Sequence, residues 1–351
     1  MTTTAPSYGV CEGHATHSEG NAVAAWERCR VDLPGSGPEF RARYQWMYRD
    51  NPAAPAQLYF LKHGAEREDV GFVTVAGRAF EYDGRALLTG LLIDFVVDPK
   101  HRTAFPALLL QRHVHQAGLQ GKALLYGIPD TKAVPIFKRL SCSFNLPIPR
   151  FVRITRFGKY VGRKLPAPLA APVGMLIGIA DRIGVGLTVL RSGCKGSWVD
   201  SFDERFDELW KRAGKPGTVV GRRDAAFLRW RFGRPDDRMK IYAVGDSGAA
   251  GIHTYFVGRV EADAFVVKDV LSAATGATLV GALHSFVQAA RALGVNSLSM
   301  SVLPDAQLRQ ALDATRFVER DHRVCFWTLS TTESAALQGA SWYLTPADED
   351  M

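Results

Sequence analysis

The chain has 351 residues, of which 47% are hydrophobic and 22% are charged. This length suits about two domains, and the composition excludes a mainly disordered, collagen-like or coiled-coil protein. Five scattered cysteines without a CxxC pair exclude a disulfide scaffold and a cysteine zinc site, and they favour a reducing compartment. The formal net charge is +8. The segment 150–195 carries this whole excess, with nine basic residues against one acidic residue, Asp181.

The N-terminal part of the chain predicts a tail followed by an α+β domain. Residues 1–25 start with a polar stretch that has no apolar core, which excludes a signal peptide and predicts a disordered tail. The first domain is predicted at 26–157 and opens with an aromatic-rich helix at 38–49. Strands rich in β-branched and aromatic residues follow at 58–62, 70–76, 78–82 and 86–97. The last two are joined by the hairpin turn Tyr82-Asp83-Gly84-Arg85, and an amphipathic helix (104–119) and a buried strand (122–127) complete the order.

Residues 158–197 predict a basic linker rich in proline and glycine, with an apolar stretch at 173–190. Asp181 and Arg182 interrupt that stretch, which argues against a membrane span of about 20 apolar residues. Two arrangements fit the remaining pattern. The stretch is a helix packed between the domains, or an interfacial helix whose basic flanks meet anionic lipid.

The second domain, predicted at 198–331, repeats the first. Asp269 follows Asp94 by 175 residues, and Pro304-Asp305 follows Pro129-Asp130 by the same offset. The predicted elements keep the same order, with a helix at 223–232, strands at 240–244, 251–258 and 264–271, a helix at 278–293 and a strand at 297–302. Residues 332–351 are predicted as a C-terminal tail. The fold class is therefore α+β, with antiparallel strands followed by one strand–helix–strand crossover in each copy.

The segment LIDFVVDPKHRTAFPALLLQ, at 92–111, resembles the central strand, pyrophosphate loop and first crossover helix of the GNAT acyltransferase superfamily. The repeat resembles a tandem pair of such domains, each a mixed central sheet flanked by helices. The resemblance implies acyl-CoA or acetyl-CoA as co-substrate, held where the central strand splays from its neighbour and where a helix N-terminus seats the pyrophosphate. The implied donor-binding residues are Val96, Val97, Asp98, Arg102, Thr103, Ala104, Phe105, Pro106 and Ala107.

The pyrophosphate loop departs from the family pattern, Arg/Gln-x-x-Gly-x-Gly/Ala, at two positions. Phe105 replaces the first glycine, and Pro106 has no N–H to offer a phosphate. The second copy has Gly276 but no arginine, so it is predicted to bind no CoA.

Three residues are candidates for acid–base chemistry. Asp94 and Glu81 are candidate bases for the acceptor ammonium, and Tyr126 is a candidate acid for the leaving thiolate. Phe137 lies at the position where the family often has a tyrosine that acts as the general acid. The alternatives are that Asp94 has a structural role, as its repeat at Asp269 suggests, and that Tyr126 is a core-edge aromatic.

These features predict an N-acyltransferase in which a small-molecule amine attacks the thioester directly, with the donor on the first domain and the acceptor in the cleft between the domains. An acyl carrier protein is an alternative donor, since its acidic surface would suit the basic segment. Two other functions stay open: a non-catalytic, degenerate GNAT binding protein, and an aminoacyl-tRNA-dependent ligase of the same double fold. No metal and no nucleic-acid partner is expected. The predicted location is cytoplasmic, with peripheral contact at the inner membrane face as a further expectation.

Overall fold

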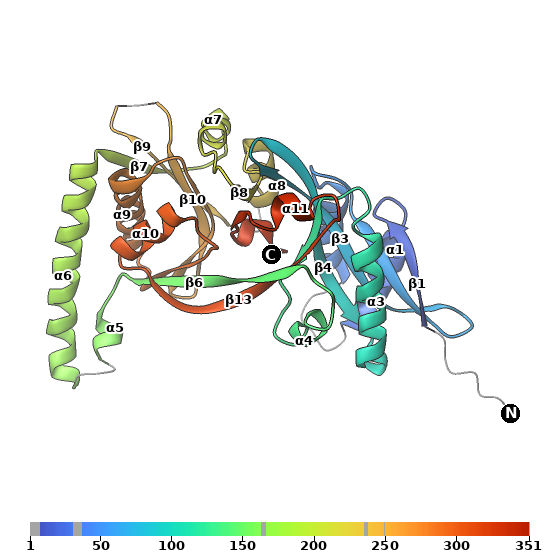
Figure 1. Ribbon diagram of the computed structural model, residues 1–351. Helices are drawn as coiled ribbons and strands as arrows, with labels where there is room; N and C mark the ends of the chain where they lie inside the picture. The colour runs from blue at the N-terminus through green and yellow to red at the C-terminus, as the bar shows by residue number, and fades with distance from the viewer. Residues whose placement is uncertain (1–7, 31–36, 163–165, 235–237, 249, 351) are drawn as a thin grey trace. The chain divides into compact units, whose positions relative to one another are not determined.

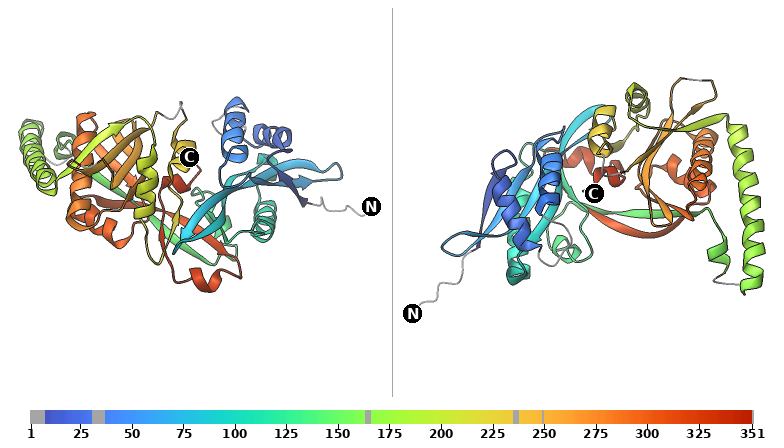
Figure 2. Two further views of the ribbon diagram at one scale, coloured as in Figure 1. Left: turned by 90° about the horizontal axis from the view of Figure 1, so that it is seen from above. Right: turned by 180° about the vertical axis from the view of Figure 1, so that it is seen from behind.

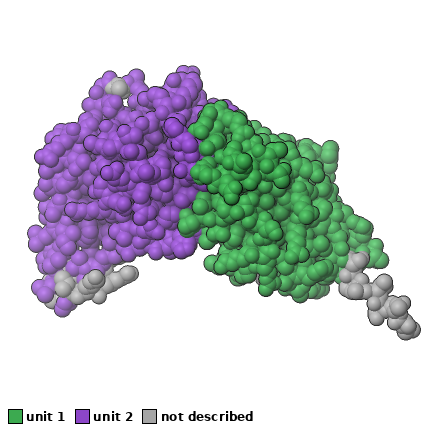
Figure 3. Space-filling view, viewed as in Figure 1, with its two compact units in different colours: residues 1–147, 324–340, 350 green, residues 148–323, 341–349, 351 purple. Residues whose placement is uncertain are grey.

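The computed structural model describes residues 8–30, 37–162, 166–234, 238–248 and 250–350. The chain forms two compact units (Figure 3). Unit 1 comprises residues up to 147 together with 324–340 and 350, and unit 2 comprises 148–323 and 341–349, with residue 351. Each unit is α+β, as predicted, and each is described by itself below.

Unit 1 is a sheet with helices on both faces. Its elements are β1 (Tyr8–His14), α1 (Glu19–Cys29), α2 (Gly37–Arg43), a π-helical turn (Tyr44–Arg49), β2 (Gln57–His63), β3 (Glu68–Tyr82), β4 (Arg85–Val97), a 3₁₀ turn (Pro99–His101), α3 (Ala104–Ala117), β5 (Leu124–Gly127), α4 (Val134–Phe137) and α11 (Ser334–Leu337). Helices α1 and α2 lie on one face and α3 on the other (Figure 2). The predicted disordered tail at 1–25 is wrong in its described part, because β1 pairs with β2 and α1 packs on β3.

Unit 2 repeats this order. Its elements are α5 (Gly158–Val161), α6 (Ala167–Ser192), β7 (Cys194–Val199), α7 (Glu204–Arg212), β8 (Thr218–Gly221), α8 (Ala225–Phe232), β9 (Lys240–Asp246), β10 (Thr254–Glu261), β11 (Ala264–Ser272), α9 (Gly276–Ala292), β12 (Ser297–Ser301), α10 (Ala306–Ala314), β14 (Ser341–Tyr343) and a 3₁₀ turn (Pro346–Asp348). The predicted tail at 332–351 is wrong, because it contains α11 and β14, and Trp342, Tyr343 and Leu344 are buried.

The predicted internal repeat is present in the structure. Strands β2-β3-β4 and β9-β10-β11 are antiparallel, and a crossover helix then returns the chain to a parallel partner, β5 beside β4 and β12 beside β11. The hairpin predicted at 82–85 is also confirmed. Asp83 and Gly84 have φ of 48° and 78°, as a two-residue turn between twisted strands requires.

The two units exchange strands, which the sequence pattern did not predict. The end of β6 (Phe144–Ile154) follows the first copy in the chain but pairs with β12 in unit 2. The end of β13 (Val318–Leu329) follows the second copy but pairs with β5 in unit 1. The strand orders are β1-β2-β3-β4-β5-β13 in unit 1 and β6-β12-β11-β10-β9-β7 in unit 2. The predicted boundaries at 157 and 198 therefore differ from those of the units.

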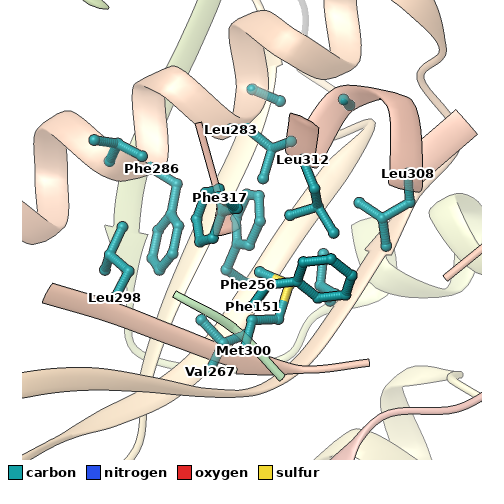
Figure 4. Close-up of a cluster of buried hydrophobic side chains, with 14 of the residues drawn as sticks. Phe151, Phe256, Val267, Leu283, Phe286, Leu298, Met300, Leu308, Leu312 and Phe317 are labelled. Carbon is teal, nitrogen blue, oxygen red and sulfur yellow. The ribbon is translucent and has the colours of Figure 1, made fainter. Parts of the chain in front are cut away.

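Each unit has its own apolar core. In unit 2 the side chains of α9 and α10 interlock with those of β10, β11 and β12, and Phe286 stacks on Phe256 at 4.2 Å between ring centroids (Figure 4). In unit 1 the core includes Leu92, Leu125, Phe137 and Phe326. The segment predicted as a linker folds into α5 and α6, and α6 packs on α9 within unit 2 (Figure 1).

Candidate functional site

The predicted donor loop of unit 1 is largely engaged by its own chain. The Asp98 carboxylate accepts the Lys100 N–H at 2.9 Å and caps the short turn that follows β4. The Arg102 guanidinium donates to the carbonyls of Val97 at 2.8 Å and Cys29 at 2.6 Å. Its charge is thus held against backbone oxygen atoms, where the family resemblance implied contact with a pyrophosphate. Thr103 is the N-cap of α3 and makes no side-chain cap bond.

The splayed region of β4 in unit 1 is filled by side chains. Pairing of β4 with β5 stops at Leu91 and Tyr126, so the expected splay is present. Val96 and Val97 stay paired with β3 and are buried. Phe137 is only 4% exposed, lies against Gly127 and packs on Phe326 at 5.5 Å between ring centroids.

The N-terminus of α3 has few groups for an anion. Ala104 and Phe105 are exposed, with Phe105 at 65%, whereas Pro106 and Ala107 are buried in the first turn. Since proline has no N–H, this turn offers one donor fewer than an ordinary helix start.

Asp94 lies at an irregularity of β4 and has a positive φ of 51°. Its carboxylate accepts from the Tyr48 hydroxyl at 2.7 Å and from Arg43 Nε at 3.1 Å. It also lines a hollow of about 290 Å³ together with Glu39 and Asp350. Asp94 is thus part of a hydrogen-bonded ion pair at the edge of a polar hollow.

Glu81 and Tyr126 are not brought together with Asp94. Glu81 pairs with Ala86, eight residues before Asp94 on β4, which separates them by about 25 Å along the strand. The expectation that Glu81 lies beside Asp94 is therefore wrong. Tyr126 is fully buried, with its ring stacked on Trp327 at 5.0 Å and edge-on to Phe80 at 5.5 Å. This environment fits the alternative that Tyr126 is an aromatic residue of the core. It does not suit an acid that must reach a substrate.

Unit 2 has a cavity of about 490 Å³ at the position equivalent to the donor loop of the first copy. Pairing of β11 with β12 ends at Val267 and Met300, so residues 268–272 leave the ladder with β12. The cavity lies beyond this point. Its wall is made by four stretches of the unit, residues 212–218, 270–279, 304–308 and 341–343.

The cavity combines a positive wall with an apolar one. Thr275 is the N-cap of α9 without a side-chain cap bond, and helix geometry leaves the N–H groups of Gly276, Ala277 and Thr278 without an intrahelical acceptor. Arg212 and Lys215 line the same cavity. Arg212 donates to the carbonyls of Glu208 and Ile252, and Lys215 pairs with Asp305, whose carboxylate also lines the cavity. Val270, Leu279, Leu308, Trp342 and Tyr343 supply the apolar surface.

Close approach to the start of α9 is sterically open. Gly276 has a φ of 52°, and a Cβ placed there would meet no atom within 4 Å. Lys215 Nζ pairs with Asp305 and lies 4.7 Å from the centre of the Tyr343 ring. Burial raises the pKa of Tyr343 well above its usual value, and its hydroxyl donates to the Val270 carbonyl, so this tyrosine is neutral and engaged.

Asp269, the repeat of Asp94, has a similar set of partners. It accepts from the Tyr255 hydroxyl at 2.6 Å and from Arg223 Nε at 3.3 Å, and Thr345 also donates to it. Arg223 bonds Asp348 as well, and the side chains of Asp269, Arg223 and Asp348 are wholly buried. In each copy, therefore, the aspartate at the equivalent position is bound by one tyrosine and one arginine.

Comparisons of the sequence with known proteins find no relative. No protein-family model matches the sequence, and no curated protein matches it. Within the described residues, no group of three or more His, Cys, Asp or Glu side chains is placed to hold a metal ion.

Solved structures do match over nearly the whole chain. A probable N-acyltransferase from Enterococcus faecalis, described as a conserved protein of unknown function, has a TM-score of 0.62 at 12% identity, over 95% of this chain and 74% of its own. A GCN5-related N-acetyltransferase from Kribbella flavida has a TM-score of 0.57 at 14% identity, over 97% and 75%. The Saccharomyces cerevisiae N-myristoyltransferase, solved with bound myristoyl-CoA, has a TM-score of 0.54 at 9% identity, over 92% and 82%. At these identities the likeness shows the fold alone: the chain has the GNAT acyltransferase fold, in two tandem copies.

Proposed function

We propose that the protein is an N-acyltransferase that takes its acyl group from an acyl thioester of CoA, bound in the cavity of unit 2. The observation that carries this proposal is the place of the cavity, where β11 leaves β12 and α9 begins. A volume of about 490 Å³ lies in the range of small-ligand sites.

The parts of the cavity suit the parts of such a donor. The N-terminus of α9, whose N-cap Thr275 lines the cavity, favours the negative charge of a diphosphate. Arg212 and Lys215 lie in the same wall, and phosphate oxygens would compete there with the backbone carbonyls that Arg212 now contacts and with Asp305, which pairs with Lys215. The backbone of 268–272 has polar groups outside the β12 ladder that suit the amides of a pantetheine arm. The apolar wall around Val270 and Leu279 suits the thioester end.

In the proposed reaction an amine attacks the thioester carbon, a C–N bond forms and the C–S bond breaks. The amine proton passes to a base or to water, and the thiolate takes its proton from water, since Tyr343 is engaged with the Val270 carbonyl. The acceptor is proposed only as a small-molecule amine. This proposal moves the donor from the loop at 98–107, which the sequence favoured, to the second copy.

The two helix caps give a matched test of this assignment. Thr275 and Thr103 are each exposed N-caps without a side-chain cap bond. Aspartate is a favourable N-cap, so both Thr275→Asp and Thr103→Asp should fold at least as well as the parent. A new carboxylate at the donor site repels the diphosphate. We expect Thr275→Asp to weaken acetyl-CoA binding by about tenfold in calorimetry, and Thr103→Asp to leave it unchanged.

The opposite ranking of the two variants would return the donor to unit 1. Equal affinities for both variants and the parent would refute a diphosphate at either helix. If the parent binds neither CoA nor acetyl-CoA, the CoA proposal fails, and an acyl carrier protein or a non-catalytic role takes its place.

A further inference from the structure

Helix α6 has two different long faces. Its inner face packs on α5 and α9 of unit 2, and in every view it is the outermost helix of that unit (Figures 1 and 2). The residues turned inward recur with helical spacing: Gly174, Asp181, Val185 and Ser192. Gly174 lies against the backbone of Gly158, and Ser192 lies against Gly281 of α9. Small residues therefore bring the helix close to its neighbours on this side.

A buried ion-pair cluster holds this inner face. Asp181 is 6% exposed and pairs with Arg153 at 3.0 Å and with Arg291. Unpairing a buried carboxylate is costly, so the cluster opposes rotation of the helix about its axis. The opposite face is consequently fixed in an outward position.

The outward face is an apolar stripe, which we call the outer stripe. It consists of Leu169, Leu176, Ile179, Ile183, Leu187 and Leu190, which are 44–78% exposed. At about 100° per residue these six positions fall within an arc of about 80°, opposite the inner face. Aliphatic side chains exposed in a continuous row along a helix mark a surface that binds something apolar.

The charges beside the outer stripe are basic. Arg182 and Arg191 are exposed and flank the stripe on its two sides, and Arg156 and Lys195 are exposed near the helix. The single acidic residue between 150 and 195 is Asp181, which is buried and paired. An apolar row between arginines suits the boundary between the acyl chains and the anionic headgroups of a lipid layer.

We propose that α6 lies flat on an anionic membrane surface, with the outer stripe among the acyl chains and its arginines among the headgroups. If two copies paired through this stripe, their flanking arginines would lie close together, and the segment has no exposed acidic residue to pair with them. Stable helix pairs instead place opposite charges beside the apolar seam. By length and composition Ala171–Ser192 is long and apolar enough to cross a membrane, with a mean hydropathy of 1.7. This finding differs from the sequence analysis, in which Asp181 and Arg182 argued against a membrane span. A crossing orientation would require Asp181 to separate from Arg153 and Arg291, whereas a flat orientation keeps these ion pairs.

Sedimentation with lipid vesicles tests the proposal on the full chain. We expect binding to vesicles of phosphatidylcholine with phosphatidylglycerol to exceed binding to phosphatidylcholine alone by about tenfold, and to fall as salt is raised. The paired change Ile183→Glu with Leu187→Glu should lower binding by about tenfold or more without moving the melting temperature, because both side chains are exposed. Val318→Glu, at an apolar position of β13 that is 49% exposed, is the matched control and should bind like the parent.

Three results would overturn the proposal. The first is a parent that stays in the supernatant with both vesicle types. The second is a concentration-dependent dimer in light scattering that the paired variant abolishes, which would assign the outer stripe to a second copy. The third is membrane binding that resists alkaline extraction, which would mean that the helix crosses the bilayer.

Discussion

The repeated aspartates allow a direct comparison of one substitution in two environments. Asp269→Asn and Asp94→Asn each keep the shape of the side chain and remove its charge. Asp269 and its partner Arg223 are both wholly buried, whereas the Asp94 side chain is 6% exposed and that of its partner Arg43 is 17% exposed. Although burial alone would lower it, Asp269 and Asp348 raise the pKa of Arg223 well above its usual value, so this guanidinium stays charged.

The expected costs follow from these differences. Breaking a buried ion pair costs about 3–5 kcal/mol, and since Asp348 still pairs with Arg223, we expect about 3 kcal/mol for Asp269→Asn. For Asp94→Asn we expect about 1–2 kcal/mol, because Arg43 remains near Asp350 at 3.6 Å and reaches solvent. For a unit of this size the corresponding falls in melting temperature are about 6–12 °C and about 2–8 °C.

Thermal and urea unfolding of the parent and both variants provide the measurement. An Asp269→Asn protein as stable as the parent would refute the structural role argued for the buried cluster. Turnover in Asp94→Asn should fall only in proportion to the folded fraction. A stable, CoA-binding but inactive Asp94→Asn protein would instead make Asp94 the catalytic base.

Two further predictions concern pH and packing. Burial lowers the pKa of His115 and of His284 to about 4, so the unfolded chain takes up protons between about pH 6.5 and 4 that the folded chain does not. Stability should therefore fall as the pH is lowered through that window, by about 1–3 kcal/mol for each histidine, and urea titrations of His115→Asn and His284→Asn should show a weaker pH dependence. Gly258→Ala should cost about 2–4 kcal/mol, because its Cβ would press on the Val266 carbonyl and lie 2.6 Å from the Phe265 ring. Gly20→Ala, with no atom within 4 Å, should be neutral or stabilising by about 0.5–1 kcal/mol, which thermal melts of both variants can check.

Local pattern predicted the repeat because its apolar strands and helices recur in register. It did not predict β1, where Tyr8–His14 reads as polar and irregular. This strand forms because its backbone pairs with β2, and an edge strand needs no long apolar run of its own. The same reason explains β14, whose burial depends on pairing with β8, more than 100 residues earlier in the chain.

The candidate site was harder to predict because its determinants are distant in sequence. Arg102 matched the family loop, yet its charge is taken by the Cys29 carbonyl, 73 residues away. The sequence predicts no CoA at the second copy, because that copy has no arginine beside Gly276. In the folded unit the basic residues at the cavity, Arg212 and Lys215, come from a segment about 60 residues earlier, where Arg212 donates to two backbone carbonyls and Lys215 pairs with Asp305. Gly276 was the available signal, because it begins the helix whose N-cap, Thr275, lines the cavity.

The strand exchange makes the predicted first domain incomplete as a fragment. Residues 1–157 lack the end of β13, whose Phe326 and Trp327 are 4% and 0% exposed in the core of unit 1. Losing each of these side chains costs about 3–5 kcal/mol, and together they consume most of the 5–15 kcal/mol that stabilises a typical domain. Removal of β13 also leaves β5 as an open edge, which promotes aggregation. We therefore expect the fragment 1–157 to be unfolded or aggregated in circular dichroism and light scattering, and to become soluble when it is co-expressed with 158–351. Trp327→Ala in the full chain is the milder counterpart and should fold with a stability lower by about 3–5 kcal/mol. A monomeric 1–157 fragment with a cooperative melting transition would show that unit 1 does not need the strand it receives from the second copy.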